Sequence, residues 1–536
     1  MTLEMHPLRW GDPAHATALP DGARALVEAV FGPAPATSAH DATSETELPG
    51  ALPPPGLSAS LLSSLAEVVG EQHVRTDDEI RRLRTRGKST ADLLRARAGD
   101  LDDAPDAVVR PGSHDEVAEV LRLAGSHRVA VVPFGGGTCV TGGLAARREG
   151  FAGVVSLDLG RLDSLVDVDR TSMTATLQPG LRGPRAEALL AEHGLTIGHF
   201  PQSFEHASIG GFAATRSSGQ ASAGYGRFDA LVVGLTVATP TGTLRLGTAP
   251  ANAAGPDLRQ LVLGSEGAFG VITEVKVRVR AVPEVKVYDG WRWASFGDGL
   301  AAVRALAQSG LRPTVLRLSD EAESAVNLAD PDSIGGGAGG CLMIVGYEGA
   351  AGRVDAERAA ATALLEGLGG TNAGEEPGRA WEHGRFAAPY LRDSLLDLGV
   401  LVETLETATF WSGVDRLYAD VKAALERVLG DGGAPVLVLC HVSHVYETGC
   451  SLYFTVAARQ AGDPVEQWLA AKTAASDAIV AAGATITHHH AVGTDHQPWL
   501  SDEIGEVGVR VLRAVKAELD PAGVLNPGVL VPLDGA

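Results

Sequence analysis

The chain has 536 residues, a hydrophobic content of 45% and a formal net charge of −22 at pH 7. It is too long for one hydrophobic core and too apolar to be disordered, so we expect a soluble enzyme of roughly two or three domains. The negative charge argues against nucleic acid or an anionic membrane surface as an electrostatic partner, and an anionic substrate must therefore be held by locally placed Arg or Lys side chains.

The first part of the chain, 1–100, is predicted to be an N-terminal helical and linker region. The apolar pattern of 61–69 and the charged run 77–98 indicate helices. Ahead of both, 33–55 is rich in Ala, Pro, Ser and Thr. This composition is typical of a linker or a surface loop.

A domain rich in strands is predicted over 101–284. Ser113 is expected to cap a helix because Glu116 follows three residues later, and the apolar run 129–132 indicates the strand after that helix. Further strands are expected at 108–111, 154–157, 174–178, 231–239 and 271–279.

A second domain is predicted over 285–482, where strand and helix patterns alternate. The most economical arrangement is an antiparallel sheet covered on one face by helices, which makes the protein α+β. In the helix 414–429, the apolar residues Val414, Leu417 and Val421 share one face. Strands are expected at 285–288, 314–318, 342–347, 436–440 and 451–456, and helices at 297–309, 354–368, 414–429 and near 474–482.

The cysteines and the chain start bear on the cellular compartment. Cys139, Cys341, Cys440 and Cys450 lack CxxC spacing, which predicts neither a zinc ribbon nor a disulfide framework. The start carries no basic region followed by an apolar one, and the longest apolar runs, such as 436–440, are far below spanning length. We therefore expect a protein of the reducing cytoplasm.

The most informative segment follows the strand 129–132. It reads Pro133, Phe134, Gly135, Gly136, Gly137, Thr138 and Cys139. Glycines at the end of a strand let the backbone adopt φ > 0 and turn several N–H groups toward one point, which suits a pyrophosphate. Alone, such a loop is weak evidence.

Three further segments add weight to the glycine loop. The first comprises Gln202, Ser203, Phe204, Glu205, His206, Ala207, Ser208, Gly210 and Gly211. The second comprises Thr215, Arg216, Ser217 and Ser218, and the third Glu266, Gly267, Ala268, Phe269, Gly270, Val271 and Ile272. These ordered segments, spread over ~150 residues, are similar to the FAD-binding domain of the vanillyl-alcohol oxidase type.

This resemblance implies a two-subdomain FAD-binding domain over 101–284, with the segments above as the cofactor-binding residues and 285–482 as a cap, or substrate, domain. Neither His nor Cys occupies the place of Phe134 beside the glycine loop, so FAD is expected to be noncovalent. The last part, 483–536, has a helical pattern at 502–519 and is expected to return to the FAD site.

The second half resembles the alkyldihydroxyacetonephosphate synthase family, whose members make ether lipids. The residues that carry the resemblance are Arg317, Arg392, Tyr453 and the triplet His488, His489 and His490. The closing segment 520–528 is shared more widely among flavin enzymes. The resemblance extends over nearly the whole chain.

The resemblance implies a transferase that exchanges the acyl group of acyl-dihydroxyacetone phosphate for a fatty alcohol, through a flavin N5 adduct and without net oxidation. Tyr453 and the His triplet are the matched acid/base group, because a His with a pKa near the working pH, or a Tyr made more acidic by a His, suits proton removal. Arg392 and Arg317 match the phosphate-binding positions. We expect a homodimer, and a lipid substrate leaves room for peripheral contact with a membrane.

The sequence departs from the family pattern at several positions. Ala491 stands where the family usually has Gly, and 494–496 replaces a basic continuation. Gln202 and His206 replace the more typical Asp and Phe. These changes bear more on the identity of the substrate than on the binding of FAD.

Other interpretations remain open. A dehydrogenase or oxidase of a 2-hydroxy acid such as D-lactate would share the FAD segments, and a flavin-binding protein without chemistry would have lost Tyr453 or the arginines. Tyr453 would serve equally well as a core aromatic, and Arg317 and Arg392 as interdomain salt bridges. On a strand, His488 and His490 would share a face, but no carboxylate or Cys pattern completes a known metal site, so we predict none.

Overall fold

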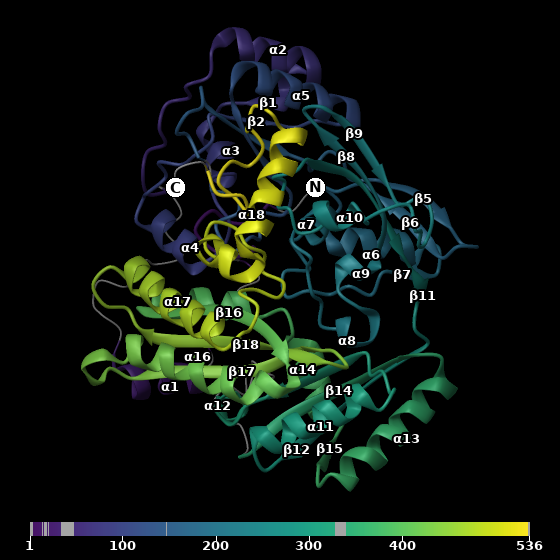
Figure 1. Cartoon of the computed structure of the whole chain (residues 1–536). Helices are drawn as coiled ribbons and strands as arrows, with labels where there is room; N and C mark the ends of the chain where they lie inside the picture. Colours follow the sequence, from purple (N-terminus) through teal and green to yellow (C-terminus); the bar gives the residue numbers. More distant parts are fainter. Residues whose placement is uncertain are drawn as a thin grey trace.

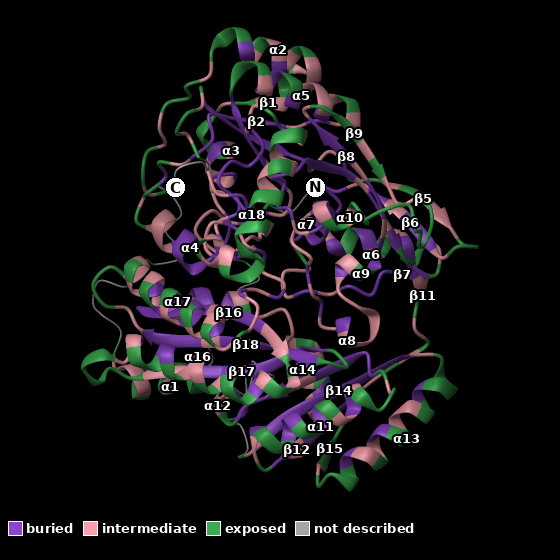
Figure 2. Ribbon diagram, in the orientation of Figure 1, coloured by how far each residue is buried: buried purple, intermediate pink, exposed green. Residues whose placement is uncertain are grey.

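The structure is a computed structural model that describes residues 4–12, 14, 19, 21–33, 48–145, 147–326 and 339–533. Most of the expected linker, 34–47, lies outside the described residues. Figure 1 shows an upper half built from the earlier strands and the last helix, and a lower half built on one large sheet. In Figure 2, buried residues follow the strands of both halves, whereas the outer helices are buried on one side only.

The N-terminal region contains helices α1 (Asp21–Phe31), α2 (Ala59–Val69), α3 (Asp78–Leu83) and α4 (Thr90–Arg97). The charged run 77–98 is therefore two helices separated by a short connection. Ser89 begins the second one, because its side chain accepts a hydrogen bond from the Asp92 backbone N–H at 3.0 Å and Asp92 accepts one from the Ser89 N–H at 3.2 Å.

A four-stranded sheet has the order β1-β2-β4-β3. Its strands are β1 (Val74–Arg75), β2 (Ala107–Val109), β4 (Val154–Asp158) and β3 (Ala130–Phe134), with β4 parallel to both of its neighbours. Helix α5 (His114–His127) begins as predicted, since the Ser113 side chain accepts a hydrogen bond from the Glu116 N–H at 3.1 Å. The glycine loop follows directly after the C-terminal end of β3.

A five-stranded antiparallel sheet follows, with the order β5-β6-β10-β8-β9. Its strands are β5 (Leu165–Asp169), β6 (Thr174–Leu177), β10 (Val271–Arg278), β8 (Val232–Thr239) and β9 (Gly242–Leu246). Around it lie α6 (Gly183–Ala191), β7 (Leu195–Thr196), α7 (Ile209–Ala214), α8 (Ser222–Tyr225), α9 (Phe228–Leu231), α10 (Arg259–Val262) and β11 (Arg280–Ala281).

The lower half contains a seven-stranded sheet with the order β15-β12-β14-β13-β17-β18-β16. All of its pairings are antiparallel, as predicted. The strands are β12 (Val285–Trp293), β13 (Val315–Ser319), β14 (Cys341–Gly349), β15 (Thr371–Gly374), β16 (Val400–Phe410), β17 (Val436–Val445) and β18 (Gly449–Arg459).

Helices cover one face of this sheet. They include α11 (Phe296–Gln308), α13 (Ala351–Gly367), α16 (Val414–Leu429) and α17 (Pro464–Ala481), which share one core with the strands. Helix α16 has the predicted bounds, with Val414, Leu417 and Val421 buried. The remaining helices are α12 (Glu321–Val326), α14 (Glu376–Gly384), α15 (Ala388–Asp397) and α18 (Leu500–Leu519).

Successive side chains of a strand lie on opposite faces of the sheet, so alternate residues lie in this core and the others lie on the opposite face. On β17, Val438, Cys440 and Val442 pack under the helices, whereas Leu437, Leu439 and His441 line a cavity on the opposite face. On β18, Leu452, Phe454 and Val456 are in the core, and Tyr453, Thr455 and Ala457 line the cavity. Because of this alternation, Tyr453 and His441 lie on the cavity face of the sheet and not in the core.

Two features of the structure were not predicted from the sequence. The edge strand β16, which pairs with β18 along its whole length, has no counterpart among the predicted strands. Its buried residues Glu403 and Glu406 interrupt the apolar pattern by which strands are recognised. The triplet His488–His490 does not lie on a strand, because it occupies an irregular loop between α17 and α18.

The division at 101–284 and 285–482 stays a prediction.

Candidate active site

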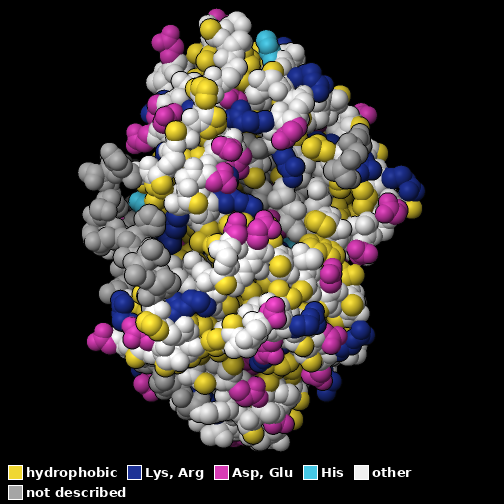
Figure 3. Space-filling model, turned by 90° about the vertical axis from the view of Figure 1, so that its left-hand side faces the viewer, with side chains coloured by type: hydrophobic (Ala, Val, Ile, Leu, Met, Phe, Trp, Pro, Cys, Tyr) yellow, Lys and Arg dark blue, Asp and Glu magenta, His cyan; other side chains and the backbone are white. Residues whose placement is uncertain are grey.

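A cavity of about 470 Å³ lies where the glycine loop and its neighbours meet the open face of the large sheet. Hydrophobic side chains also gather across the middle of the molecular face in Figure 3. Predicted cofactor residues that line the cavity are Pro133, Gly135, Gly136, Gly137, Thr138, Cys139, Gln202, Ser203, Ala207, Ser208, Gly210, Gly211, Thr215, Ser217, Ser218, Glu266, Gly267, Gly270, Val271 and Ile272.

The other predicted cofactor residues do not line the cavity. The Phe134 ring lies under the Arg84 guanidinium, 4.7 Å from its carbon, and Phe204 stacks on Phe386. Arg216 donates to the Leu263 and Gln260 carbonyls. His206 meets Trp10 edge-on, Ala268 and Phe269 belong to a separate core with α18, and Glu205 is exposed.

The glycine loop is closely packed against the predicted segment 202–211. Gly137 has φ +71°, which favours glycine. A Cβ on Gly135 would lie 2.3 Å from Ser208 Oγ, so a larger residue would displace the N-cap of α7. All three glycines line the cavity, so the backbone of the loop borders the space that a bound pyrophosphate would occupy.

Buried polar atoms on the wall indicate a polar occupant. Gln202 Nε2, Gln220 Oε1 and Glu266 Oε1 are buried without a hydrogen-bond partner among the described residues. Such atoms cost free energy unless a ligand or water satisfies them. The Gly-rich cradle and these atoms together fit a dinucleotide such as FAD. Burial raises the pKa of Glu266 to about 7.

The last segment of the chain also reaches this wall. Asn526 Nδ2 donates to the carbonyls of Gly143 at 3.0 Å and Glu266 at 2.7 Å. The Gly493 N–H donates to Glu266 Oε2 at 2.8 Å. Residues that follow the His triplet thus hold the third cofactor segment in place.

Tyr453 lies at the centre of an aromatic cluster on the sheet side. Its ring stacks on His441 with centroids 5.0 Å apart, lies parallel to His489 at 6.2 Å and meets His490 edge-on at 5.6 Å. The hydroxyl donates to Thr404 Oγ1 at 3.0 Å. Burial raises the Tyr453 pKa to about 12, so the expectation of a more acidic Tyr is wrong.

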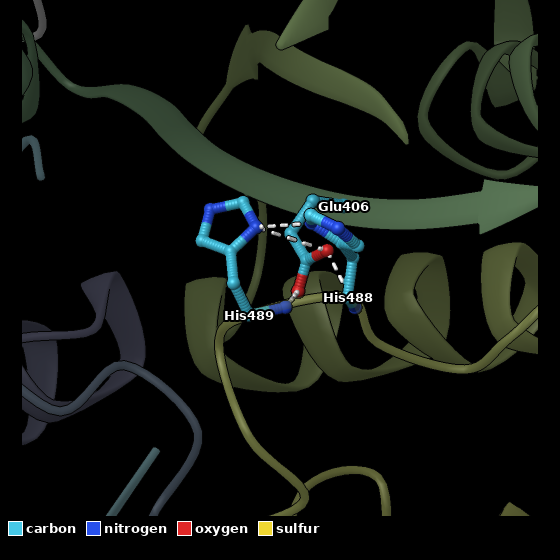
Figure 4. A group of neighbouring side chains, drawn as sticks. All are labelled: Glu406, His488 and His489. Carbon is cyan, nitrogen blue, oxygen red and sulfur yellow. Dashed lines mark hydrogen bonds and ion pairs between the residues drawn. The ribbon is translucent and has the colours of Figure 1, made fainter. Parts of the chain in front are cut away.

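Glu406 organises the His loop from β16 (Figure 4). Its Oε1 accepts the N–H groups of His489 at 3.0 Å and His490 at 2.9 Å, and the Thr487 hydroxyl at 2.6 Å. Its Oε2 accepts the His488 N–H at 2.7 Å and lies 3.5 Å from His489 Nδ1. Although Glu406, His488 and His489 have metal-ligand spacing, donors already occupy both carboxylate oxygens.

The triplet is held neutral by its surroundings. Burial lowers the pKa of His489, although the Glu406 carboxylate opposes this shift. Burial also lowers the pKa of His490 to about 3 and the pKa of His488 well below its usual value. His489 lines the cavity, and its lowered pKa favours the unprotonated form at neutral pH.

The two predicted phosphate-binding arginines also line the cavity, but each has partners within the chain. Arg317 pairs with Glu323 at 2.5 Å and lies 3.0 Å from His441 Nε2. Arg392 donates to the Lys88 carbonyl at 2.6 Å and pairs with the adjacent Asp393 at 3.2 Å. Their role in substrate binding stays a prediction.

Comparison with known proteins decides the family. A family model described as FAD binding domain matches residues 105–247, and one described as FAD linked oxidases, C-terminal domain, matches 282–530. Alkyldihydroxyacetonephosphate synthase of Dictyostelium discoideum is 34% identical over 85% of this chain and 78% of its own length. The Trypanosoma brucei brucei enzyme of the same name is 32% identical, over 90% and 82%.

The chain belongs to the alkyldihydroxyacetonephosphate synthase family. A solved alkyldihydroxyacetonephosphate synthase structure superimposes with a TM-score of 0.80 at 29% identity, covering 98% of each chain. The predicted resemblance and the α+β fold are confirmed, and so are the FAD cofactor and the identification as an enzyme that acts on a small molecule. Among the described residues, no helix combines the length and apolarity that crossing a membrane requires.

The cavity has an apolar arm that sequence reasoning missed. Helix α1 contributes Ala23 and Val27 to the lining, and Val27 packs with Val402, Leu437 and Ala457 on the sheet. The Arg459 Nε donates to the Phe31 carbonyl at 3.0 Å and fixes the end of this helix. The short amphipathic pattern of 21–31 was the available signal.

Proposed function

We propose that this enzyme exchanges the acyl group of acyl-dihydroxyacetone phosphate for a fatty alcohol. The acyloxy group leaves as a fatty acid and the alcohol oxygen takes its place on the same carbon, so no net oxidation occurs. The observation that carries the proposal is one cavity bounded by the FAD loops, by Tyr453 with His489 and His490, and by the apolar arm under α1.

The arrangement supports distinct roles for these parts. When bound, FAD supplies the covalent and electronic chemistry of the exchange. His489 removes a proton from the carbon that bears the ester oxygen, since it is neutral and faces the cavity. Tyr453, with its pKa of about 12, remains protonated and positions the substrate oxygen or relays the proton through Thr404.

The apolar arm accommodates the aliphatic chain. Its walls are side chains such as Leu26, Val27 and Leu439, and burying a chain of methylene groups there contributes about 0.8 kcal/mol for each CH₂. A small 2-hydroxy acid would leave these walls without contact. This feature favours a lipid over the D-lactate alternative.

The proposal is tested with purified enzyme, acyl-dihydroxyacetone phosphate and a long-chain alcohol, with products detected by mass spectrometry. We expect the alkyl product, and exchange of a carbon-bound substrate hydrogen with solvent deuterium while the flavin stays oxidised at the end of the cycle. Anaerobic bleaching by D-lactate, with no alkyl product from the lipids, would instead support a dehydrogenase.

The proposal extends to assembly. We propose that the enzyme is a homodimer, and that it contacts the membrane peripherally because its substrates partition into lipid. We also propose that the chain divides into the units 1–100, 101–284, 285–482 and 483–536. Sedimentation velocity and flotation with neutral lipid vesicles test the first two points. A monomer, or a protein that stays at the bottom of the gradient, would contradict them.

A further inference from the structure

Three arginines line the cavity among the described residues: Arg317, Arg385 and Arg392. Arg317 is paired with Glu323, and Arg392 with Asp393. Within the described part of the chain, Arg385 has no carboxylate partner, and its guanidinium donates no hydrogen bond to the protein. It is therefore the arginine whose five donors remain available to a ligand.

The surroundings of Arg385 hold its guanidinium without neutralising it. The guanidinium carbon lies 5.0 Å from the Phe386 ring centroid, 5.2 Å from that of Phe200 and 5.9 Å from that of Trp381. Aromatic faces attract the cation and restrict its motion, but they leave the N–H groups at its edge free. The residue is thus pre-organised for a planar, bidentate contact with an anion.

Arg385 is also tied to the FAD side of the cavity. Its carbonyl accepts a hydrogen bond from Gln220 Nε2 at 3.0 Å, and Gln220 follows the second cofactor segment, 215–218, closely in sequence. Both residues line the cavity. An anion bound by Arg385 would therefore share this space with the reacting part of the substrate.

The charge of the cavity makes this cation important. No lysine lines the cavity among the described residues, whereas Glu266, Glu323 and Glu403 do. On a chain with a net charge of −22, a dianionic head group would be repelled unless a local cation binds it. We infer that Arg385 binds the phosphate group of the substrate, an inference that rests on the proposed function.

The test compares Arg385→Gln with the matched control Arg379→Gln, an exposed arginine on the neighbouring helix α14 that pairs with Glu375. Each holoenzyme is assayed with acyl-dihydroxyacetone phosphate and with the same ester lacking the phosphate. We expect Arg385→Gln to lower kcat/KM for the phosphorylated ester by about 30-fold, the scale of a hydrogen bond to a charged group. The unphosphorylated ester should be turned over as before, and the control variant should match the wild type.

Three outcomes would overturn the inference. An equal loss on both esters would indicate a structural role, and loss of FAD with unchanged substrate preference would assign Arg385 to the pyrophosphate of the cofactor. Unchanged kinetics would show that no contact exists. If the wild type turns over neither ester, the proposed function fails, but calorimetric titration with inorganic phosphate still tests the site. Heat of binding in the wild type and in Arg379→Gln, but not in Arg385→Gln, would support the site. Equal binding in all three proteins would refute it.

Discussion

Replacing Glu406 with Gln tests the anchoring of the His loop. The carboxylate accepts hydrogen bonds from Thr487, His488, His489 and His490. A Gln side chain keeps one acceptor oxygen, but its NH₂ group would face a backbone N–H and leave it unsatisfied. Losing a charged acceptor and burying an unpaired donor costs about 2–4 kcal/mol.

This cost is best measured locally, because a chain of several domains does not unfold in one step. Hydrogen exchange of the amides 488–490 should quicken by roughly 30- to 1,000-fold in Glu406→Gln. The matched control is Glu403→Gln on the same strand, because Glu403 accepts from the Thr90 and Thr404 N–H groups and not from the His loop. Unchanged protection at 488–490 would refute the reasoning.

The pH profile of the same variant separates a catalytic effect from a structural one. The Glu406 charge raises the pKa of His489, so its removal lowers that pKa, and the acidic limb of kcat/KM should move to lower pH. Other groups that face or act on His489 are His488, His490, Tyr453, His441, His199, His444 and Arg227. A lower rate with an unmoved limb would show that Glu406 acts on loop structure alone.

Three further results are expected. Tyr453→Phe should reduce turnover by about 100-fold and abolish deuterium exchange, because the hydroxyl that donates to Thr404 is gone, while bound FAD measured by absorbance stays normal. Acid precipitation should release the flavin into the supernatant, and colour in the pellet would contradict noncovalent binding beside Phe134. Ala23→Leu should shorten the longest alcohol used from a mixture of graded chain lengths, because Ala23 lines the apolar arm, and an unchanged product distribution would place the chain elsewhere.

Much of the site could be predicted from sequence because its signals are local. The glycine loop follows an apolar strand directly, and the alternation along β18 places Tyr453 opposite the core residues Leu452 and Phe454. The positions of these residues depend on neighbours within a few positions in the chain. The pKa of Tyr453 was predicted wrongly because it depends on burial by distant segments.

The residues that sequence reasoning missed act across long sequence separations. Glu406 receives its donors from residues about 80 positions later, and within its own strand it looks only like an interruption of an apolar pattern. In the sequence, Arg385 looks like any other arginine at the end of a helix, and only the structure shows that it has no carboxylate partner among the described residues. Arg392 donates to the carbonyl of Lys88, 304 positions away, whereas Arg385 lies against the Phe200 ring, and contacts between such distant positions are a tertiary property.

The position of α1 separates two properties of the enzyme along the chain. The wall of the apolar arm comes in part from α1, whereas the proposed acid/base residues lie between 404 and 490. Under the proposed function, an exchange of the N-terminal helix would change the preferred length of the alcohol without disturbing the residues proposed to move the proton. Chimeras that swap only this helix between relatives offer a direct route to new ether-lipid products.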